Sequence, residues 1–388
     1  MIDLRSDTVT KPSKEMKTFM MDAVLGDDVF QDDPTVKELE EKTARMFGHE
    51  AGLFCSSGTM TNQIALMVYL RPGDEVICSS EANIYNYEGG GIARNSGASA
   101  RLINRNSGIV YLEEIIDNIN PDDIHYPVTN LVALENTINR GGGIARNSGA
   151  SARLINRNSG IVYLDEIIDN INPDDIHYPV TNLVALENTI NRGGGVCYPI
   201  TEIEKISKFC RSKNIPLHLD GARLFNALVK TGVKSNYIGP LFDSISICFS
   251  KGLGAPVGSV LVGSKDFIHK ARRVRKVIGG GMRQVGMLAA AGIYALENNI
   301  ERLAVDHHHA DLLAEGLRNC TWIERVMKVE TNIVIGYMKE GFQNSNFVEK
   351  LQKLGVSIVS FGKGRIRMVT HLDVSKEDID KVITLLKF

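Results

Sequence analysis

The segment that carries most chemical information is DSISICFSKGLGAPVGSVLVGS, residues 243–264, in which an apolar run ends at Ser250-Lys251 and glycines follow. Such an apolar run is typical of a buried parallel strand, and the loops at the carboxyl ends of these strands often carry function. A lysine in this position, beside Gly252 and Gly254, can lose solvent, lower its pKa and act as an amine nucleophile. The alternative for Lys251 is a solvated loop lysine.

A second candidate is Asp220, at the end of the apolar run in IPLHLDGARLFNA, residues 215–227. A carboxylate at the end of a buried strand needs a partner, because an isolated buried charge is costly. One such partner is the ring nitrogen of a pyridinium cofactor. Asp220 would keep that nitrogen protonated, so that the ring could accept the electrons left when a bond at the substrate α-carbon breaks. The alternative is a helix N-cap, a common role for aspartate.

A third candidate is an anion-binding turn in FCSSGTMTNQIALMVYL, residues 54–70. A strand, a glycine turn and an amphipathic helix follow one another there, an order that points the backbone N–H groups of Gly58 and Thr59 at a phosphate. Alone the motif is weak, since Ser-Gly-Thr is also an ordinary helix start. Together with Asp220 and Lys251 it predicts a pyridoxal 5'-phosphate site on the large aspartate-aminotransferase-like fold (fold type I), an α/β architecture.

Several long motifs, taken in chain order, resemble the low-specificity L-threonine aldolases: MIDLRSDTVTKP, GDDVF..DDPTV, SSGTM.NQ, EGG, LVALENT.N..GG, LHLDGARLFNA, FSKGLGAPVGSVLVG and GGGMRQ.G.LAAAGIYAL. The resemblance implies a homotetrameric lyase, with active sites shared between subunits, that splits L-threonine or L-allo-threonine into glycine and acetaldehyde. By position, Lys251 matches the Schiff-base lysine and Asp220 the ring-nitrogen carboxylate. Gly58 and Thr59 match the phosphate contacts.

The resemblance also implies which residues hold the substrate carboxylate, namely Ser6, Arg223 and Arg367. Arginine suits this role because its planar fork can meet both carboxylate oxygens at once. Lys276 and Arg283, in RKVIGGGMRQ, match basic residues at the cofactor phosphate that reach across a subunit boundary. The alternative for Lys276 is a solvated basic helix face.

The chain departs from the family at the histidine that stacks on the cofactor ring, because Asn83 replaces it. An amide has no aromatic face and cannot carry a proton near neutral pH. We therefore expect Asn83 to lie at the cofactor, where binding survives but the retro-aldol step is slowed. Gln31 likewise replaces the usual glycine after GDDVF, beside Phe30, where it would crowd the entrance.

A near-identical repeat interrupts the chain. Residues 89–143 recur at 141–195 with an offset of 52, and the 55 aligned positions differ only at Glu113 and Asp165. Repeats that have drifted keep a hydrophobic pattern and lose identity, so this is a recent duplication or an artefact and not a solenoid. Each copy predicts one strand, helix and strand step, and the second copy is one step more than the sheet needs.

The repeat duplicates two site positions as well. The family's His-x-Pro-x-Thr histidine, linked to the substrate β-hydroxyl side, occurs as His125 and as His177, and either of them, or a water, is a candidate general base. The two ENT segments likewise offer Asn136 and Asn188. Because the copies are nearly identical, the sequence favours neither copy.

The elements that must position these residues alternate along the chain, as a mostly parallel sheet covered on both faces requires. We predict helices at 34–47, 57–69, 83–94, 111–119, 202–211 and 266–277, and strands at 51–54, 75–78, 98–104, 130–135, 216–220, 244–249 and 259–262. From about residue 290 the pattern changes to a helical tract at 287–317, strands at 332–337, 357–359 and 365–369, and helices at 344–354 and from 376. This indicates a large cofactor-binding domain over 1–290 and a smaller α+β domain over 291–388.

Composition excludes several other functions. The 388 residues carry 44 Lys and Arg against 46 Asp and Glu, a net charge of −2, which argues against a nucleic-acid or anionic-membrane partner. No apolar run is long enough to cross a bilayer, and the N-terminus lacks the apolar core of a signal peptide, so we expect a cytoplasmic protein.

Cysteines and histidines give no sign of a metal site. The six cysteines are scattered, without metal-ligand spacing, and are interpreted as reduced, small apolar residues. Cys55, beside the glycine turn, is the one cysteine whose position could give it another role. The triplet 307–309 is all histidine, but adjacent helical residues point about 100° apart and cannot converge on one ion. We expect a solvated helix segment there and no metal.

Two rival functions remain open. Another pyridoxal-phosphate reaction, such as racemisation, transamination or β-elimination, would use the same Lys251 and Asp220 but release no glycine. A protein that binds the cofactor with impaired activity is also compatible with Asn83 and the duplication.

Overall fold

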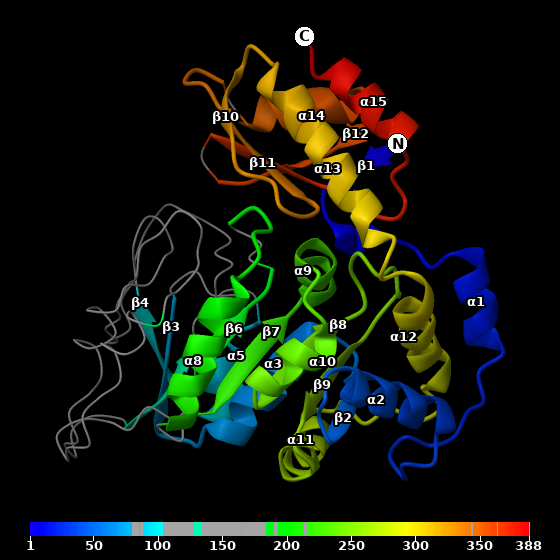
Figure 1. The fold of residues 1–388 in the computed structure, drawn as a ribbon, viewed down its shortest axis with the longest axis vertical. Coiled ribbons are helices and arrows are strands. Elements are labelled where there is room, and N and C mark those ends of the chain that lie inside the picture. The colour runs from blue at the N-terminus through cyan, green and yellow to red at the C-terminus, as the bar shows by residue number, and fades with distance from the viewer. Residues whose placement is uncertain are drawn as a thin grey trace.

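The computed structural model describes residues 1–79, 85, 88–103, 128–133, 164, 184–189, 193–212, 216–342, 344–362 and 364–387. Figure 1 shows a large sheet with helices around it and a smaller unit at the top, where both chain termini lie. Among the residues so described, no helix is both long enough and apolar enough to span a membrane.

The large sheet has eight strands and is mostly parallel. Its order is β2 (Ala51–Cys55), β9 (Ser259–Gly263), β8 (Ser244–Cys248), β7 (Leu217–Gly221), β6 (Val184–Glu187), β5 (Val128–Ala133), β3 (Asp74–Ser79) and β4 (Ser99–Ile103). Only β9 runs antiparallel to its neighbours among these strands. The α/β class and the mostly parallel sheet expected from the sequence are confirmed.

Two neighbouring strands of this sheet come from the two copies of the repeat. β5 belongs to the first copy and β6 to the second, and they pair in parallel with Val132 opposite Val184 and Ala133 opposite Ala185. Each pair is separated by the repeat offset of 52, so each residue faces its own duplicate. β6 borders β7, whereas β5 lies between β6 and β3.

Helices cover both faces of the sheet. They are α1 (Lys14–Met21), α2 (Pro34–Met46), α3 (Gly58–Tyr69), α5 (Gly91–Ser96), α8 (Ile200–Ser212), α9 (Leu224–Thr231), α10 (Ser235–Ile238), α11 (Lys265–Val277) and α12 (Gly286–Asn298). Leu53 packs in one cluster with residues of α3 and α11, while the next residue, Phe54, packs in another with residues of α2, α8 and α12. This alternation of period two is what a strand buried on both faces requires.

The smaller unit has its own core. An antiparallel sheet of β10 (Ile323–Val326), β11 (Ile333–Met338), β14 (Arg365–Val369) and β13 (Val359–Ser360) packs with α13 (Leu303–Arg318), α14 (Asn344–Lys353) and α15 (Lys376–Leu385). The chain start joins this unit, because β1 (Ile2–Asp3) pairs with β12 (Val356–Ser357) and Ile2 and Leu4 lie in its core.

Three predicted elements differ in the structure. The helical tract 287–317 breaks after Asn298, because the Asn299 side chain turns to donate a hydrogen bond to Leu253 O (2.8 Å). The strand predicted at 357–359 divides between β12 and β13, which belong to different sheets. Within 83–94, residues 88–90 form a bend and turn, and α5 begins only at Gly91, because Gly90 adopts a left-handed φ of 74°.

Candidate active site

The predicted cofactor residues meet at one edge of the large sheet. β2, β6, β7 and β8 run in the same direction, since each lies parallel to the next or is separated from it by the antiparallel β9. The carboxyl ends of parallel strands lie at the same edge, where open α/β sheets bind their ligands. Gly58, Asn188, Asp220 and Lys251 follow or end these four strands, so the fold brings them to that edge.

Lys251 lies just after β8 and is half-buried. Its Nζ donates a hydrogen bond to Cys248 Sγ (3.3 Å), and its carbonyl accepts one from Thr10 Oγ1 (3.0 Å). Burial alone would raise the pKa of the Cys248 thiol, but the Lys251 ammonium beside it holds this pKa below its ordinary value. Sulfur is a weak hydrogen-bond acceptor, so this contact holds Nζ only loosely.

Asp220, on β7, has both carboxylate oxygens hydrogen-bonded. Oδ1 accepts from Ala222 N (3.0 Å) and Oδ2 accepts from Asn62 Nδ2 of α3 (3.1 Å). These two donors fix the orientation of the carboxylate. On the same strand, burial lowers the pKa of His218 to about 4, against the opposing effect of Asp220, so His218 is neutral near pH 7.

The anion turn predicted at Gly58 and Thr59 is the first turn of α3. Ser57 is the N-cap, and its Oγ accepts a hydrogen bond from Met60 N (3.1 Å). The N–H groups of the first residues of a helix have no acceptor within the helix and carry the positive end of its dipole. Gly58 and Thr59 thus present N–H groups suited to a phosphate.

The predicted carboxylate-binding residue Arg223 is part of a buried ion pair. Its Nε and Nη2 donate to the two oxygens of Asp7 (2.8 and 2.7 Å), which also accepts from Asn332 Nδ2 (3.1 Å). Burial would raise the pKa of Asp7, but the Arg223 guanidinium holds it well below its usual range. Sequence reasoning missed Asp7, because its partner lies 216 residues away; its place in MIDLRSDTVTKP was the only signal.

Arg367 and Ser6 lie where the smaller unit meets the chain start. Arg367, on β14, donates from Nη2 to Arg5 O (3.2 Å), and burial, with the nearby charge of Arg223 adding to it, lowers its pKa to about 10. Ser6 Oγ accepts from Thr8 N (3.2 Å) and Thr8 Oγ1 (2.9 Å). Both arginines that were predicted to hold a carboxylate therefore influence each other across the two units.

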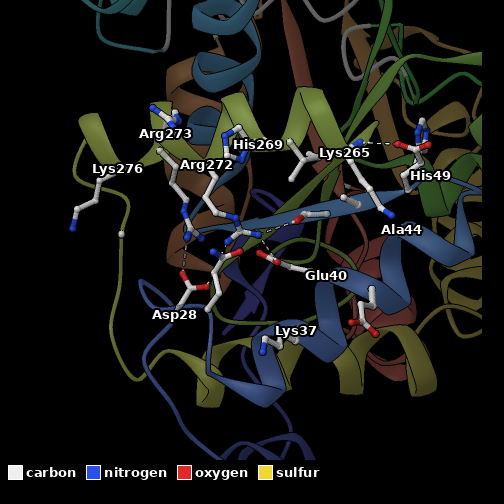
Figure 2. Close-up of a pocket in the computed structure, with 18 of the residues that line it drawn as sticks. Asp28, Lys37, Glu40, Ala44, His49, Lys265, His269, Arg272, Arg273 and Lys276 are labelled. Carbon is white, nitrogen blue, oxygen red and sulfur yellow. Dashed lines mark hydrogen bonds and ion pairs between the residues drawn. The ribbon is translucent and has the colours of Figure 1, made fainter.

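Lys276 and Arg283 are both exposed side chains. Lys276 is exposed in the last turn of α11, and Arg283 Nη1 donates to Asp27 Oδ2 (2.9 Å). In Figure 2 the Lys276 side chain points outward from the end of its helix. Both are accessible to a second molecule.

A cavity of about 730 Å³ lies between α2 and α11, and it is lined by Lys276 but by neither Lys251 nor Asp220. Figure 2 shows Arg272 pointing from α11 toward Glu40 of α2, and its Nη2 lies 2.7 Å from Glu40 Oε2. Arg275 of α11 pairs with Asp28 (2.7 Å), which lies in the segment before α2. Burial raises the pKa of Glu40 in spite of Arg272. The two pairs fasten α11 to α2 and to the segment that precedes it.

The histidine triplet differs from the prediction. His307 and His309 are buried, so the expected solvated helix segment is wrong. The reason is packing of α13 against α9, where His307 Nε2 lies 3.0 Å from Asn226 Oδ1, and burial lowers the pKa of His307 to about 4. Within the described ranges, no group of three potential ligands could hold a metal ion.

The cysteines follow the expectation in the part of the chain that the structure describes. Cys55, Cys197, Cys210, Cys248 and Cys320 are buried and unpaired. Burial raises the pKa of the Cys55 thiol to about 12, which makes it unreactive at neutral pH.

Four predicted site residues, Asn83, His125, His177 and Asn136, lie outside the described residues. Asn188, the second-copy counterpart of Asn136, is described and buried. Its backbone N donates to Asp220 O (3.2 Å), and its Oδ1 accepts from Tyr198 N (3.3 Å). The second copy therefore supplies the asparagine beside Asp220.

Comparison with known proteins agrees with this architecture. The low specificity L-threonine aldolase of Escherichia coli (strain K12) is 39% identical over 382 residues, which cover 98% of this chain and 97% of that protein. The probable low-specificity L-threonine aldolase 2 of Arabidopsis thaliana is 38% identical over 391 residues, 99% of this chain and 95% of that protein.

Solved structures share the fold. A putative L-allo-threonine aldolase from Listeria monocytogenes aligns with a TM-score of 0.71 at 20% identity, over 100% of this chain and 95% of that one. The Leishmania major threonine aldolase aligns with a TM-score of 0.71 at 19% identity, over 100% and 98% of the two chains. The family model described as beta-eliminating lyase matches residues 3–147 and 141–341. This chain belongs to the beta-eliminating lyase family.

Proposed function

We propose that the protein is a pyridoxal-phosphate-dependent aldolase that cleaves L-threonine or L-allo-threonine to glycine and an aldehyde. The observation that carries the proposal is the meeting of an amine, a carboxylate and a helix N-terminus, from Lys251, Asp220 and Gly58, at one sheet edge. The names of the relatives support threonine as the substrate.

The donor set fits this cofactor. The primary amine of Lys251 is the group that bonds with an aldehyde, the hydrogen-bonded carboxylate of Asp220 suits a protonated ring nitrogen, and the first N–H groups of α3 suit a phosphate. When bound, the cofactor supplies an electron sink for breaking the bond between Cα and Cβ.

The substrate carboxylate would be held mainly by Arg367, with Ser6 beside it. Arg223 already uses two N–H donors to bind Asp7, and this contact fixes the orientation of its guanidinium group. Its other N–H donors remain for a ligand. A carboxylate bound there would orient the amino acid and set which bond at the α-carbon is cleaved.

The second copy of the repeat would complete the site, because its strand β6 borders β7 and its Asn188 contacts Asp220. We therefore assign His177 of the same copy, or a water beside it, as the base that takes the β-hydroxyl proton. His125 and Asn136 of the first copy would have no role in the chemistry.

The same proposal includes a homotetramer with active sites shared between subunits. Lys276 and Arg283 would approach the cofactor phosphate of a neighbouring subunit, which agrees with their exposed positions.

The test is the visible absorption spectrum of the purified chain with added pyridoxal phosphate, followed by glycine release from L-threonine. We expect a cofactor band that is lost in Lys251→Ala and kept in Lys17→Ala, a control that removes an exposed lysine. Glycine release by Lys251→Ala should fall by at least about 1000-fold. A band that persists in Lys251→Ala, or keto acid in place of glycine, would overturn the assignment.

A second candidate, a cofactor-binding protein with little cleavage activity, is favoured by Asn83. Proton transfer by a positioned histidine contributes about 10²–10⁴-fold to rate, so Asn83→His should raise kcat for threonine by about tenfold or more. An unchanged kcat in Asn83→His, with cofactor still bound, would favour the second candidate.

A further inference from the structure

A hydrogen-bonded chain of three buried side chains runs behind Asp220. Asn62 Nδ2 donates both to Asp220 Oδ2 (3.1 Å) and to Glu88 Oε1 (3.1 Å), and Gln63 Nε2 donates to Glu88 Oε2 (2.6 Å). Asn62, Gln63 and Glu88 are only 6%, 3% and 7% exposed. Asn62 and Gln63 end the motif SSGTM.NQ, and Glu88 begins the motif EGG. The function proposed above gives Gln63 and Glu88 no role.

An amide group can make these hydrogen bonds in only one orientation. The NH₂ group of Asn62 has two N–H bonds, and each is directed to a different carboxylate. Turning the amide over would place its carbonyl oxygen against two carboxylates, which also only accept when they are ionised. Glu88 therefore fixes which end of the Asn62 amide faces Asp220.

Glu88 is itself held in place from α3 and α5. Gln63 donates to it, and the Gln63 Oε1 accepts from Asn95 Nδ2 (3.1 Å). A Cβ at Gly91 would come within 2.2 Å of Gln63 Oε1, so any side chain at the first residue of α5 would force Gln63 to shift. These contacts fix the geometry of the hydrogen-bonded chain formed by Gln63, Glu88 and Asn62.

The result is a carboxylate held in one orientation next to a site for a protonated ring. Asp220 accepts from Asn62 on one oxygen and from Ala222 N on the other. We propose that Asn62 and Glu88 are positioning residues for the ring nitrogen of the cofactor: Glu88 orients the Asn62 amide, and Asn62 holds the Asp220 carboxylate toward that nitrogen. This inference rests on the proposed function.

The experiment follows the protonation of the ring directly, by ¹⁵N NMR of pyridoxal phosphate labelled at its ring nitrogen and bound to the full chain. Asn62→Leu keeps the side-chain size and removes the donor. Its ring-nitrogen resonance should move toward the unprotonated position, and cofactor affinity should fall by about tenfold, the effect of losing one hydrogen bond to a charged group.

Glu88→Gln is the second variant, because it keeps the shape and removes the charge. A glutamine carbonyl can accept from only one of the two amides, and its own NH₂ then faces the other donor. We expect the same resonance shift, smaller than in Asn62→Leu, and no further shift in the double variant, since both residues act through one contact.

Thr43→Ala serves as the matched control. It removes a buried hydrogen bond, from Thr43 Oγ1 to Leu39 O (2.7 Å) in α2, without touching the sheet edge. It should lower the thermal midpoint as the other variants do, but leave the resonance unchanged.

Two results separate the inference from the function on which it rests. If the wild-type chain binds the cofactor through Lys251 but Asn62→Leu and Glu88→Gln keep the wild-type resonance, the inference is wrong and the aldolase assignment stands. If the wild-type chain forms no cofactor band with Lys251, the proposed function fails, and the inference fails with it.

Discussion

The two halves of the large sheet contain the same kind of strand. They differ in how the sequence determines which strands lie next to one another. In the half formed by β7, β8, β9 and β2, every strand has its own sequence, and Asp220 and Lys251 occur once. In the half formed by β6, β5, β3 and β4, two neighbouring strands come from the two copies of the repeat, and Val132 and Ala133 pair with their own duplicates.

The difference shows what fixes a strand in a sheet. Side-chain pattern sets register, and both copies satisfy it equally, so pattern cannot choose which copy borders β7. Connectivity makes that choice: the second copy leads directly through Tyr198 into α8, and Asn188 bonds to Asp220 and Tyr198. Identical sequences therefore acquire different roles from their place in the chain.

The largest effect is expected beside the unique half, at the buried pair of Asp7 and Arg223. Removing one partner of a buried ion pair costs about 3–5 kcal/mol, so Asp7→Asn should lower the unfolding free energy by about that amount. Urea denaturation at pH 7 measures it. Asp3→Asn is the control, since its ion pair with Arg5 is exposed to solvent and contributes little to stability.

The same pair predicts a pH dependence. The pKa of Asp7 is lowered in the folded chain, so its stabilisation is present above the unfolded value of 3.8 and is lost as the pH falls below it. Wild-type stability should therefore drop more steeply below about pH 4 than that of Asp7→Asn. Parallel acid profiles for both proteins would contradict the assigned pair.

The second effect compares the two halves of the repeat directly. Asn188→Ala leaves the buried N–H of Tyr198 without its acceptor, which costs about 1–3 kcal/mol, and should also slow threonine cleavage. Asn136→Ala is the same change in the first copy and should alter neither property. Equal losses in both variants would mean that both copies serve the site.

A third substitution, at Gln31 outside both halves of the sheet, should have a small effect on the free energy of unfolding. Gln31 has a left-handed φ of 58°, where an L-residue is strained by about 1 kcal/mol, so Gln31→Gly should raise the unfolding free energy by up to that amount. Gln31→Ala keeps a Cβ and should show no gain. A destabilised Gln31→Gly would contradict the strain.

The smallest effect is expected from deleting one copy. Removing residues 92–143 leaves 388 − 52 = 336 residues and one version of every duplicated motif. The deleted residues include β4, β5 and most of α5, but the second copy repeats their sequence and its β6 already borders β7. Since the second copy can take their place, cofactor affinity and threonine cleavage should change by less than about threefold. Loss of cofactor binding in the shortened chain would show that the site depends on the extra strand.

Much of the fold could be predicted because its signals are local. Apolar runs and helical periodicity placed β2, β7, β8, β9, α2, α3 and α11 within one or two residues of their bounds. The break after Asn298 was missed because it depends on a hydrogen bond to Leu253, and the burial of His307 because it depends on α9. Contacts between distant segments leave no local pattern.

The residues of the candidate site also fall into those with a local sequence signal and those without one. Lys251, Asp220 and the turn at Gly58 could be found because each ends or follows an apolar run. Asp7 and Glu88 could not be found, because the role of each depends on a partner on another element. The choice between Asn136 and Asn188 was open for a different reason, because two identical segments contain no information about their order in the sheet.

The pairing of β5 with β6 has a consequence beyond one molecule. Parallel, in-register stacking of identical segments is the contact that fibrils repeat without limit, and here it stops after two strands because β3 and β7 cover the outer edges. During refolding, β6 of one molecule can pair with β5 of another as well as with its own. Intertwined oligomers formed by strand exchange are thus the expected misassembly of this chain, and their yield should grow with protein concentration.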